Sequence, residues 1–175
     1  MKRFLAVLIL CMVMAILAIV GINLAPSGQI NQDYLRIHIR ANSNDYVDQD
    51  IKYLIKDKIV EYLTPIISSC KTKAEFQQKL SQNIPQIVCI SNELLAQNNF
   101  DYKSSASIKN EFFPTRTYDN LTLTSGYYDA LIVNLGSGKG DNWWCVVYPP
   151  LCFINGENNV YRSRMLEVIK KFFGA

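Results

Sequence analysis

The chain has 175 residues, a length that favours one domain with a short appendage. Its 49% of apolar and 19% of charged residues are typical of a globular protein and exclude a disordered chain. A formal net charge of only +3 argues against a nucleic-acid-binding protein. The single histidine excludes most histidine-based metal sites, and five cysteines are too few for a disulfide-dense miniprotein.

The N-terminal residues predict an export segment. Lys2 and Arg3 precede an uncharged run over residues 4–25 that is long enough to span a bilayer core of about 30 Å as a helix. The residues around Ala25 make a poor cleavage site, so we expect a signal-anchor in preference to a cleaved signal peptide. A buried core helix is the less favoured alternative. Both export interpretations place a tether at residues 26–32 and a domain at residues 33–175 outside the cytoplasm.

The first element of the exported part is a strand. Residues 35–40 alternate strictly between apolar and basic side chains, as in a half-buried strand. The apolar side chains share one face, and Arg36, His38 and Arg40 share the other.

Helices and further strands are expected after this strand. A first helix is predicted from the turn at residues 41–45 to about residue 66, a second from the capping box at residues 72–75, and a third from Pro85. The rest predicts four antiparallel strands and a final helix, at about residues 100–111, 118–124, 127–135, 143–148 and 160–173. Residues 136–142 predict a hairpin connection between the last two strands. An N-terminal strand, a helical segment, an antiparallel meander and a C-terminal helix are typical of the α+β class.

Two cysteines beside the last strand predict a disulfide. Six residues separate Cys145 from Cys152, and export favours their oxidation. Two free, buried thiols are the alternative. Cys70 and Cys89 are a less favoured second pair, because geometry decides whether two cysteines can be bridged.

The chemistry-bearing residues do not predict an active site. A cysteine nucleophile would need His38 as its base, and the neighbours of Cys145 do not supply the electropositive surroundings that activate a thiol. The aspartates at positions 45, 48 and 50 suit the positive end of a helix dipole better than a calcium-binding loop. We expect an interaction module with no catalytic residue, cofactor, metal or small-molecule substrate. A secreted cell-wall-acting or cysteine hydrolase is the alternative.

Two strands carry the candidate partner-binding residues. Trp143 and Trp144 point to opposite faces of the last strand, so the strand is either covered on both sides or carries an exposed aromatic patch near Tyr148. We expect one tryptophan to be a partner anchor. Arg36 and His38 are expected on a solvated face that suits an acidic partner, the more so when His38 is protonated below about pH 6.5.

Several segments resemble a known family. RIHIRANSNDYVDQDIKYLIKD at residues 36–57 and GDNWWCVVYPPLCF at residues 140–153 strongly resemble stage II sporulation protein R of endospore-forming bacteria. FFPTRTY at residues 112–118 and SGYYDALIVNLGSG at residues 125–138 look like the same family. Arg40, Asn44 and Lys56 depart from its usual residues.

The resemblance implies a function that the composition does not show. Such proteins are exported from the forespore into the space between the forespore and the mother cell. There they activate a membrane-bound aspartic protease, which processes the precursor of the sigma-E transcription factor. The family member is the signal and not the protease. If residues 4–25 are not cleaved, the membrane is a second partner.

Overall fold

The computed structural model describes residues 12, 33–118 and 121–153. The predicted tether, the closing helix and all of the predicted anchor except residue 12 lie outside these ranges. The described elements, in chain order, are β1 (Leu35–Arg40), α2 (Tyr46–Ser68), α3 (Lys73–Gln97), β2 (Ser104–Phe113), β3 (Arg116–Tyr118), β4 (Leu121–Leu123), β5 (Gly126–Leu135), β6 (Asn142–Tyr148) and the 3-10 helix η2 (Leu151–Phe153).

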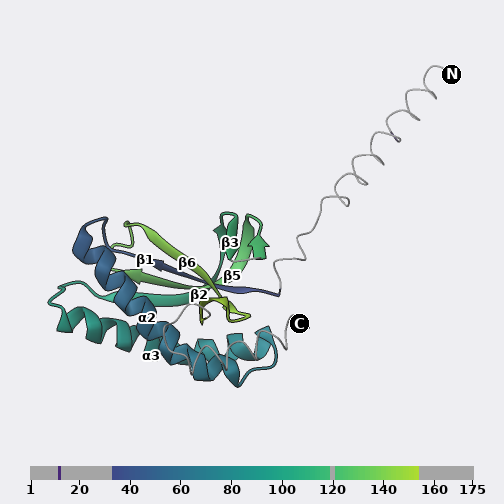
Figure 1. The fold of residues 1–175 in the computed structure, drawn as a ribbon, viewed down its shortest axis with the longest axis horizontal. Helices are drawn as coiled ribbons and strands as arrows, with labels where there is room; N and C mark the ends of the chain where they lie inside the picture. The colour runs from purple at the N-terminus through teal and green to yellow at the C-terminus, as the bar shows by residue number, and fades with distance from the viewer. Residues whose placement is uncertain (1–11, 13–32, 119–120, 154–175) are drawn as a thin grey trace, which may run out of the picture.

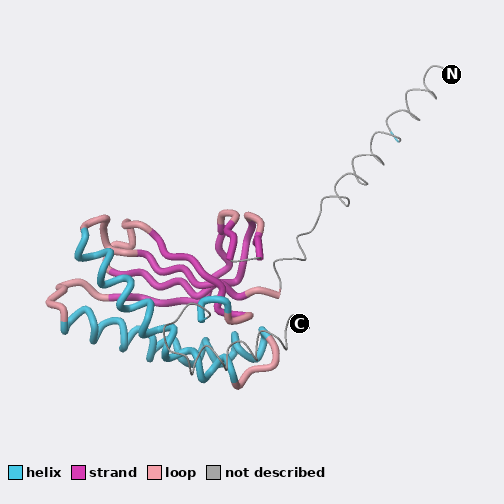
Figure 2. The backbone as a smooth tube through the Cα atoms, viewed as in Figure 1, coloured by secondary structure: helices cyan, strands magenta, loops and turns pink. Residues whose placement is uncertain are grey.

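Two layers make up this α+β domain. Four strands form one sheet in the order β2-β5-β1-β6, and β3 and β4 form a separate two-stranded sheet. Both helices lie on one side of the large sheet, and the β3–β4 hairpin stands on the other side (Figure 1). The smooth trace shows the same separation of helices from strands (Figure 2). Only one sheet face is therefore covered by the described helices.

The sheet is mixed, which corrects the predicted antiparallel meander. β1 runs parallel to β5 and antiparallel to β6, so it lies between them. Residues 136–142 therefore cross the end of β1 instead of closing a hairpin. The backbone N–H of Gly140 donates to the Ala41 carbonyl at 2.8 Å. A Cβ at Gly140 would lie 2.1 Å from the Ser43 carbonyl oxygen, so the crossing requires glycine here.

α3 passes through Pro85 without a break, so the predicted boundary between a second and a third helix is wrong. A proline inside a helix costs about 3 kcal/mol relative to alanine. A continuous apolar stripe on both sides of Pro85 outweighs this cost, because it packs against the core. The buried residues of α3 are Phe76, Leu80, Ile87, Ser91 and Leu95. The predicted cap is present, since the Thr72 side chain accepts the Glu75 N–H at 3.2 Å.

The apolar face of β1 meets the helices, as the alternation predicts. Leu35, Ile37 and Ile39 are fully buried in the core between the sheet and the helices. The structure also confirms the Cys145–Cys152 disulfide, which joins β6 to η2 with a Cα–Cα distance of 5.8 Å. Cys70 and Cys89 are free thiols, the first buried and the second exposed.

Candidate functional site

The basic face of β1 is buried, which corrects the predicted solvated stripe. Arg36 is 0% exposed and His38 is 2% exposed, whereas the Arg40 side chain keeps 30%. The cause is an aromatic cluster that covers the sheet face opposite the helices. Its members come from β1, β2, β3, β5 and β6. We refer to it as the open-face cluster: Arg36, His38, Glu111, Phe113, Tyr118, Tyr128 and Trp144.

Arg36 lies at the centre of the open-face cluster. Its Nη2 donates to the Tyr118 hydroxyl at 2.6 Å, and its guanidinium carbon lies 4.2 Å from the Phe113 ring centroid and 4.8 Å from that of Tyr128. Cation–π attraction thus replaces the carboxylate that a buried arginine usually finds. Nε and Nη1 have no hydrogen-bond partner among the described atoms. Burial lowers the pKa of Arg36, against the opposing influence of Tyr118.

His38 lies beside Arg36 and is held on all sides. Its Nδ1 is 2.7 Å from a Glu111 carboxylate oxygen, and its ring stacks on Trp144 with a centroid distance of 3.6 Å. Arg40 contacts the same Glu111 oxygen at 2.6 Å and donates to His38 Nε2 at 3.4 Å. With Nε2 accepting, the Nδ1–H donates to Glu111. Burial lowers the pKa of His38 most, while Glu111 and Asn142 oppose that shift.

The sheet geometry separates the two residues of the alternative hydrolase. Ile37 is the cross-strand partner of Cys145, and His38 is that of Trp144, so His38 and Cys145 point to opposite faces. Cys145 also lies in a disulfide and so holds no free thiol. The arrangement does not provide a cysteine–histidine pair.

The lowered pKa of His38 predicts a pH-dependent stability. The unfolded chain has the ordinary His pKa of 6.5, so it binds more protons than the folded chain just below that pH. The free energy of unfolding should therefore fall as the pH drops below about 6.5. Glu111 and Arg40 are the charged groups that face the ring. Urea unfolding at pH 7.5 and 5.5 measures the effect, and His38→Gln should reduce it. An equal loss in both proteins would contradict this prediction.

The other predicted anchors lie on the helix side of β6. A register shift between Leu35 and Arg36 moves Tyr148 away from the face of Trp144, and its ring stacks on Phe76 with a centroid distance of 5.9 Å. Trp143 also packs against the helix-side core, and the Lys56 ammonium lies 5.6 Å from its ring centroid. The predicted partner-binding residues thus fall into two separate groups, with Arg36, His38 and Trp144 in one.

A polar junction, which the sequence did not predict, lies where β1 ends. Asp48 accepts hydrogen bonds from the Tyr102 hydroxyl at 2.5 Å and from Asn42 Nδ2 at 2.9 Å. Asn42 Oδ1 in turn accepts the Ser137 N–H at 2.9 Å. Lys52, only 1% exposed, donates to the Asp141 carbonyl at 3.0 Å. We call this set of side chains, Asn42, Asp48, Lys52 and Tyr102, the loop junction.

The electrostatics of the loop junction favour an ionised Asp48. Burial raises the pKa of Asp48, but hydrogen bonds from Tyr102, Ser43 and Asn42 outweigh it and leave the pKa below its ordinary value. Burial of Tyr102 and its hydrogen bond to Asp48 raise the pKa of the Tyr102 hydroxyl. A signal was present in the sequence, because Asp48 and Lys52 fall on the buried stripe of α2 together with Ile55 and Ile59.

The described residues form neither a metal-binding cluster nor a membrane-spanning helix. Within residues 33–118 and 121–153, no group of three or more His, Cys, Asp or Glu side chains is placed to hold a metal ion. No helix in the same part of the chain has the length and apolar character to cross a membrane.

A sequence model of the family described as stage II sporulation protein R matches residues 31–158. The chain belongs to this family. Stage II sporulation protein R of Bacillus subtilis (strain 168) is 32% identical over 124 residues, which cover 71% of this chain and 55% of that relative. The chain thus spans about half the length of this curated relative. No solved structure matches the chain significantly. The resemblance seen in the sequence is confirmed.

Proposed function

We propose that this member of the sporulation protein R family is an intercompartmental signal that activates a membrane-bound aspartic protease during endospore formation. The protease in turn processes the sigma-E precursor. Membership of the family over residues 31–158 is the observation that carries the proposal. In this function the chain acts by binding and contributes no catalytic residue.

The described geometry supports a binding role. His38 and the disulfide-bonded Cys145 point to opposite sheet faces, and both nitrogens of the His38 ring are engaged by Arg40 and Glu111. Several large apolar and aromatic side chains remain exposed, which is typical of surfaces that bind proteins.

Export is part of the proposal. Residues 4–25 would direct the chain across the forespore membrane and would keep it there if they are not cleaved. The domain then acts in the intermembrane space, where the Cys145–Cys152 disulfide can persist.

The test is a reconstitution. Purified residues 26–175 are added to membrane vesicles that carry the protease and its precursor substrate, with the protease domain that receives the signal on the outer side. We expect precursor cleavage that depends on the concentration of the added chain. Vesicles with a protease that lacks its catalytic aspartate should show none. Cleavage that ignores the added chain would refute activation, and cleavage that persists with the inactive protease would favour the hydrolase alternative.

A further inference from the structure

Four exposed apolar side chains of the described chain lie close together on one helix, while Phe112 and Tyr127 form a separate exposed pair on β2 and β5. Tyr46 is 79% exposed, Val47 60%, Tyr53 48% and Leu54 41%, all within the first turns of α2. Residues that are seven apart on a helix share a face, so Val47 and Leu54 form one stripe. An apolar group of this kind on a soluble domain marks an interaction surface.

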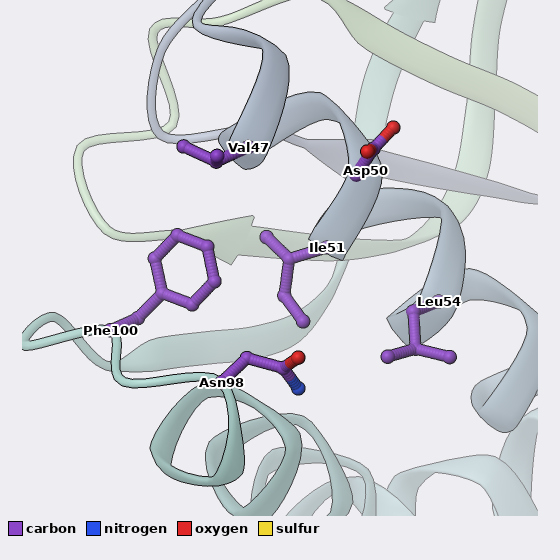
Figure 3. Close-up of a pocket in the computed structure, with 6 residues that line it drawn as sticks. All are labelled: Val47, Asp50, Ile51, Leu54, Asn98 and Phe100. Atoms are coloured by element: carbon purple, nitrogen blue, oxygen red, sulfur yellow. The ribbon is translucent and has the colours of Figure 1, made fainter.

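A hollow opens beside this stripe, between the start of α2 and the end of α3 (Figure 3). Its volume is about 360 Å³, and its lining residues are Val47, Asp50, Ile51, Leu54, Asn98 and Phe100. Figure 3 shows Phe100 and Ile51 turned toward one another across it. Asn99 adopts a φ of 62°, and the Phe100 N–H donates to the Leu95 carbonyl at 2.9 Å, which turns the chain back at the end of α3.

The two walls of the hollow are fixed relative to one another. The Phe100 and Tyr102 rings lie 5.2 Å apart between centroids, and the Tyr102 hydroxyl bonds to Asp48 on α2 at 2.5 Å. The loop junction therefore joins the segment that carries Phe100 to the helix that carries Val47 and Leu54. A hollow that is formed in advance loses less conformational entropy when it is filled.

The negative charge around the hollow favours a binding partner that carries basic residues. Asp50 is the only ionisable residue of the lining, and exposed aspartates at positions 45 and 101 flank two of its walls in sequence. A purely apolar occupant would leave these carboxylates without a counter-charge, whereas an occupant with neighbouring Lys or Arg would pair with them. A volume of about 360 Å³ lies in the range of roughly 300–1,000 Å³ that binding pockets have, and it suits large apolar side chains.

The position of the hollow suits a tethered signal. Figure 1 shows β1 running from the end where the coloured ribbon of the domain begins to the end where α2 starts. The hollow lies at that second end, beyond the six residues of β1. A domain that is held through its N-terminus therefore presents the hollow on the side away from its tether.

We infer that the hollow and its flanking stripe, Val47 and Leu54 with Asp50 and Phe100, form the docking site for a partner protein that offers large apolar side chains next to basic residues. The inference rests on the proposed function in one respect, since that function makes the partner the part of the protease exposed in the intermembrane space.

Surface variants test the inference in the reconstituted system. Leu54→Glu and Val47→Glu place a charge on exposed positions, and Asp50→Lys reverses the charge of the lining. Tyr127→Glu is the matched control, because Tyr127 is 64% exposed and pairs with Phe112 on β5 and β2, away from the hollow. Binding of the labelled chain to vesicles with and without the protease is measured together with precursor cleavage and the melting temperature.

We expect each hollow variant to weaken binding to protease-bearing vesicles at least tenfold at an unchanged melting temperature, while Tyr127→Glu binds like the parent. If the variants show these differences in binding but the parent chain triggers no precursor cleavage, the docking site is supported and the proposed activation is refuted. If the parent activates and the hollow variants do so equally well, the docking site is refuted and the proposed function stands. Equal binding to empty vesicles, or self-association that the variants abolish, would also overturn the assignment to this partner.

Discussion

Replacing Asp48 by alanine should lower the free energy of unfolding by about 3–5 kcal/mol, the range for removing one partner of a buried charged group. Asp48 is 4% exposed and accepts from Tyr102 at 2.5 Å and from Asn42 at 2.9 Å. Alanine would leave both donors in the loop junction without an acceptor. It would also release the segment after α3 from the start of α2.

Two controls separate this effect from a general loss of charge. Asp45 lies on the same turn region, is exposed and makes no side-chain cap hydrogen bond, so Asp45→Ala should cost less than about 1 kcal/mol. Asp48→Asn keeps the shape and one acceptor for Tyr102, but its amide cannot accept from Asn42, so an intermediate loss is expected. Urea unfolding at pH 7 measures all three variants. Equal stabilities of Asp48→Ala and Asp45→Ala would refute the role assigned to the loop junction.

The pH dependence of the free energy of unfolding provides a second test of the role of Asp48. The folded pKa of Asp48 lies below its ordinary value, so its stabilisation is present above the unfolded pKa of about 3.9 and is lost as the pH falls toward the folded value. The parent should therefore lose stability on going from pH 5 to pH 3 by more than Asp48→Asn does. This window lies below that of His38, so the two effects can be told apart.

Local patterns of the sequence were sufficient for several elements. Strict alternation at residues 35–40 gave β1 and its buried apolar face, and the spacing of Cys145 and Cys152 with the expected export gave the disulfide. These predictions succeed because each depends on neighbours in the chain. The predicted helix cap formed by Thr72 and Glu75 is also a local feature, because its hydrogen bond lies within four residues of the chain.

Long-range pairing explains what the local patterns missed. The parallel contact of β1 with β5 joins residues that lie about ninety positions apart, and no local rule places β1 between β5 and β6. The same insertion brings Trp144 and Phe113 around His38, which buries a face that alternation alone predicts to be solvated. The candidate hollow depends on Phe100 meeting α2, which is again a contact between segments far apart in the sequence.

Arg36 provides the second large effect: replacing it by alanine should destabilise the protein strongly, whereas replacing it by methionine should change its stability little. Arg36→Ala removes a fully buried side chain that fills the space between Phe113, Tyr118 and Tyr128, and we expect a loss of about 3–5 kcal/mol from the resulting cavity. Arg36→Met keeps most of the aliphatic volume and removes a charge whose Nε and Nη1 have no hydrogen-bond partner. Replacing such a buried charge by a hydrophobic side chain is often neutral or stabilising.

The contrast between these variants also decides what Arg36 does for the function. Arg36→Met should unfold within about 1 kcal/mol of the parent, because the lost cation–π attraction and the Tyr118 bond are offset by the removal of the desolvated charge. A residue that is 0% exposed does not touch a partner, so this variant should still bind and activate the protease like the parent. Thermal unfolding and the reconstituted cleavage measure both quantities. A stable Arg36→Met that no longer activates would show that the open-face cluster opens to the partner, and the predicted contact of Arg36 would then hold.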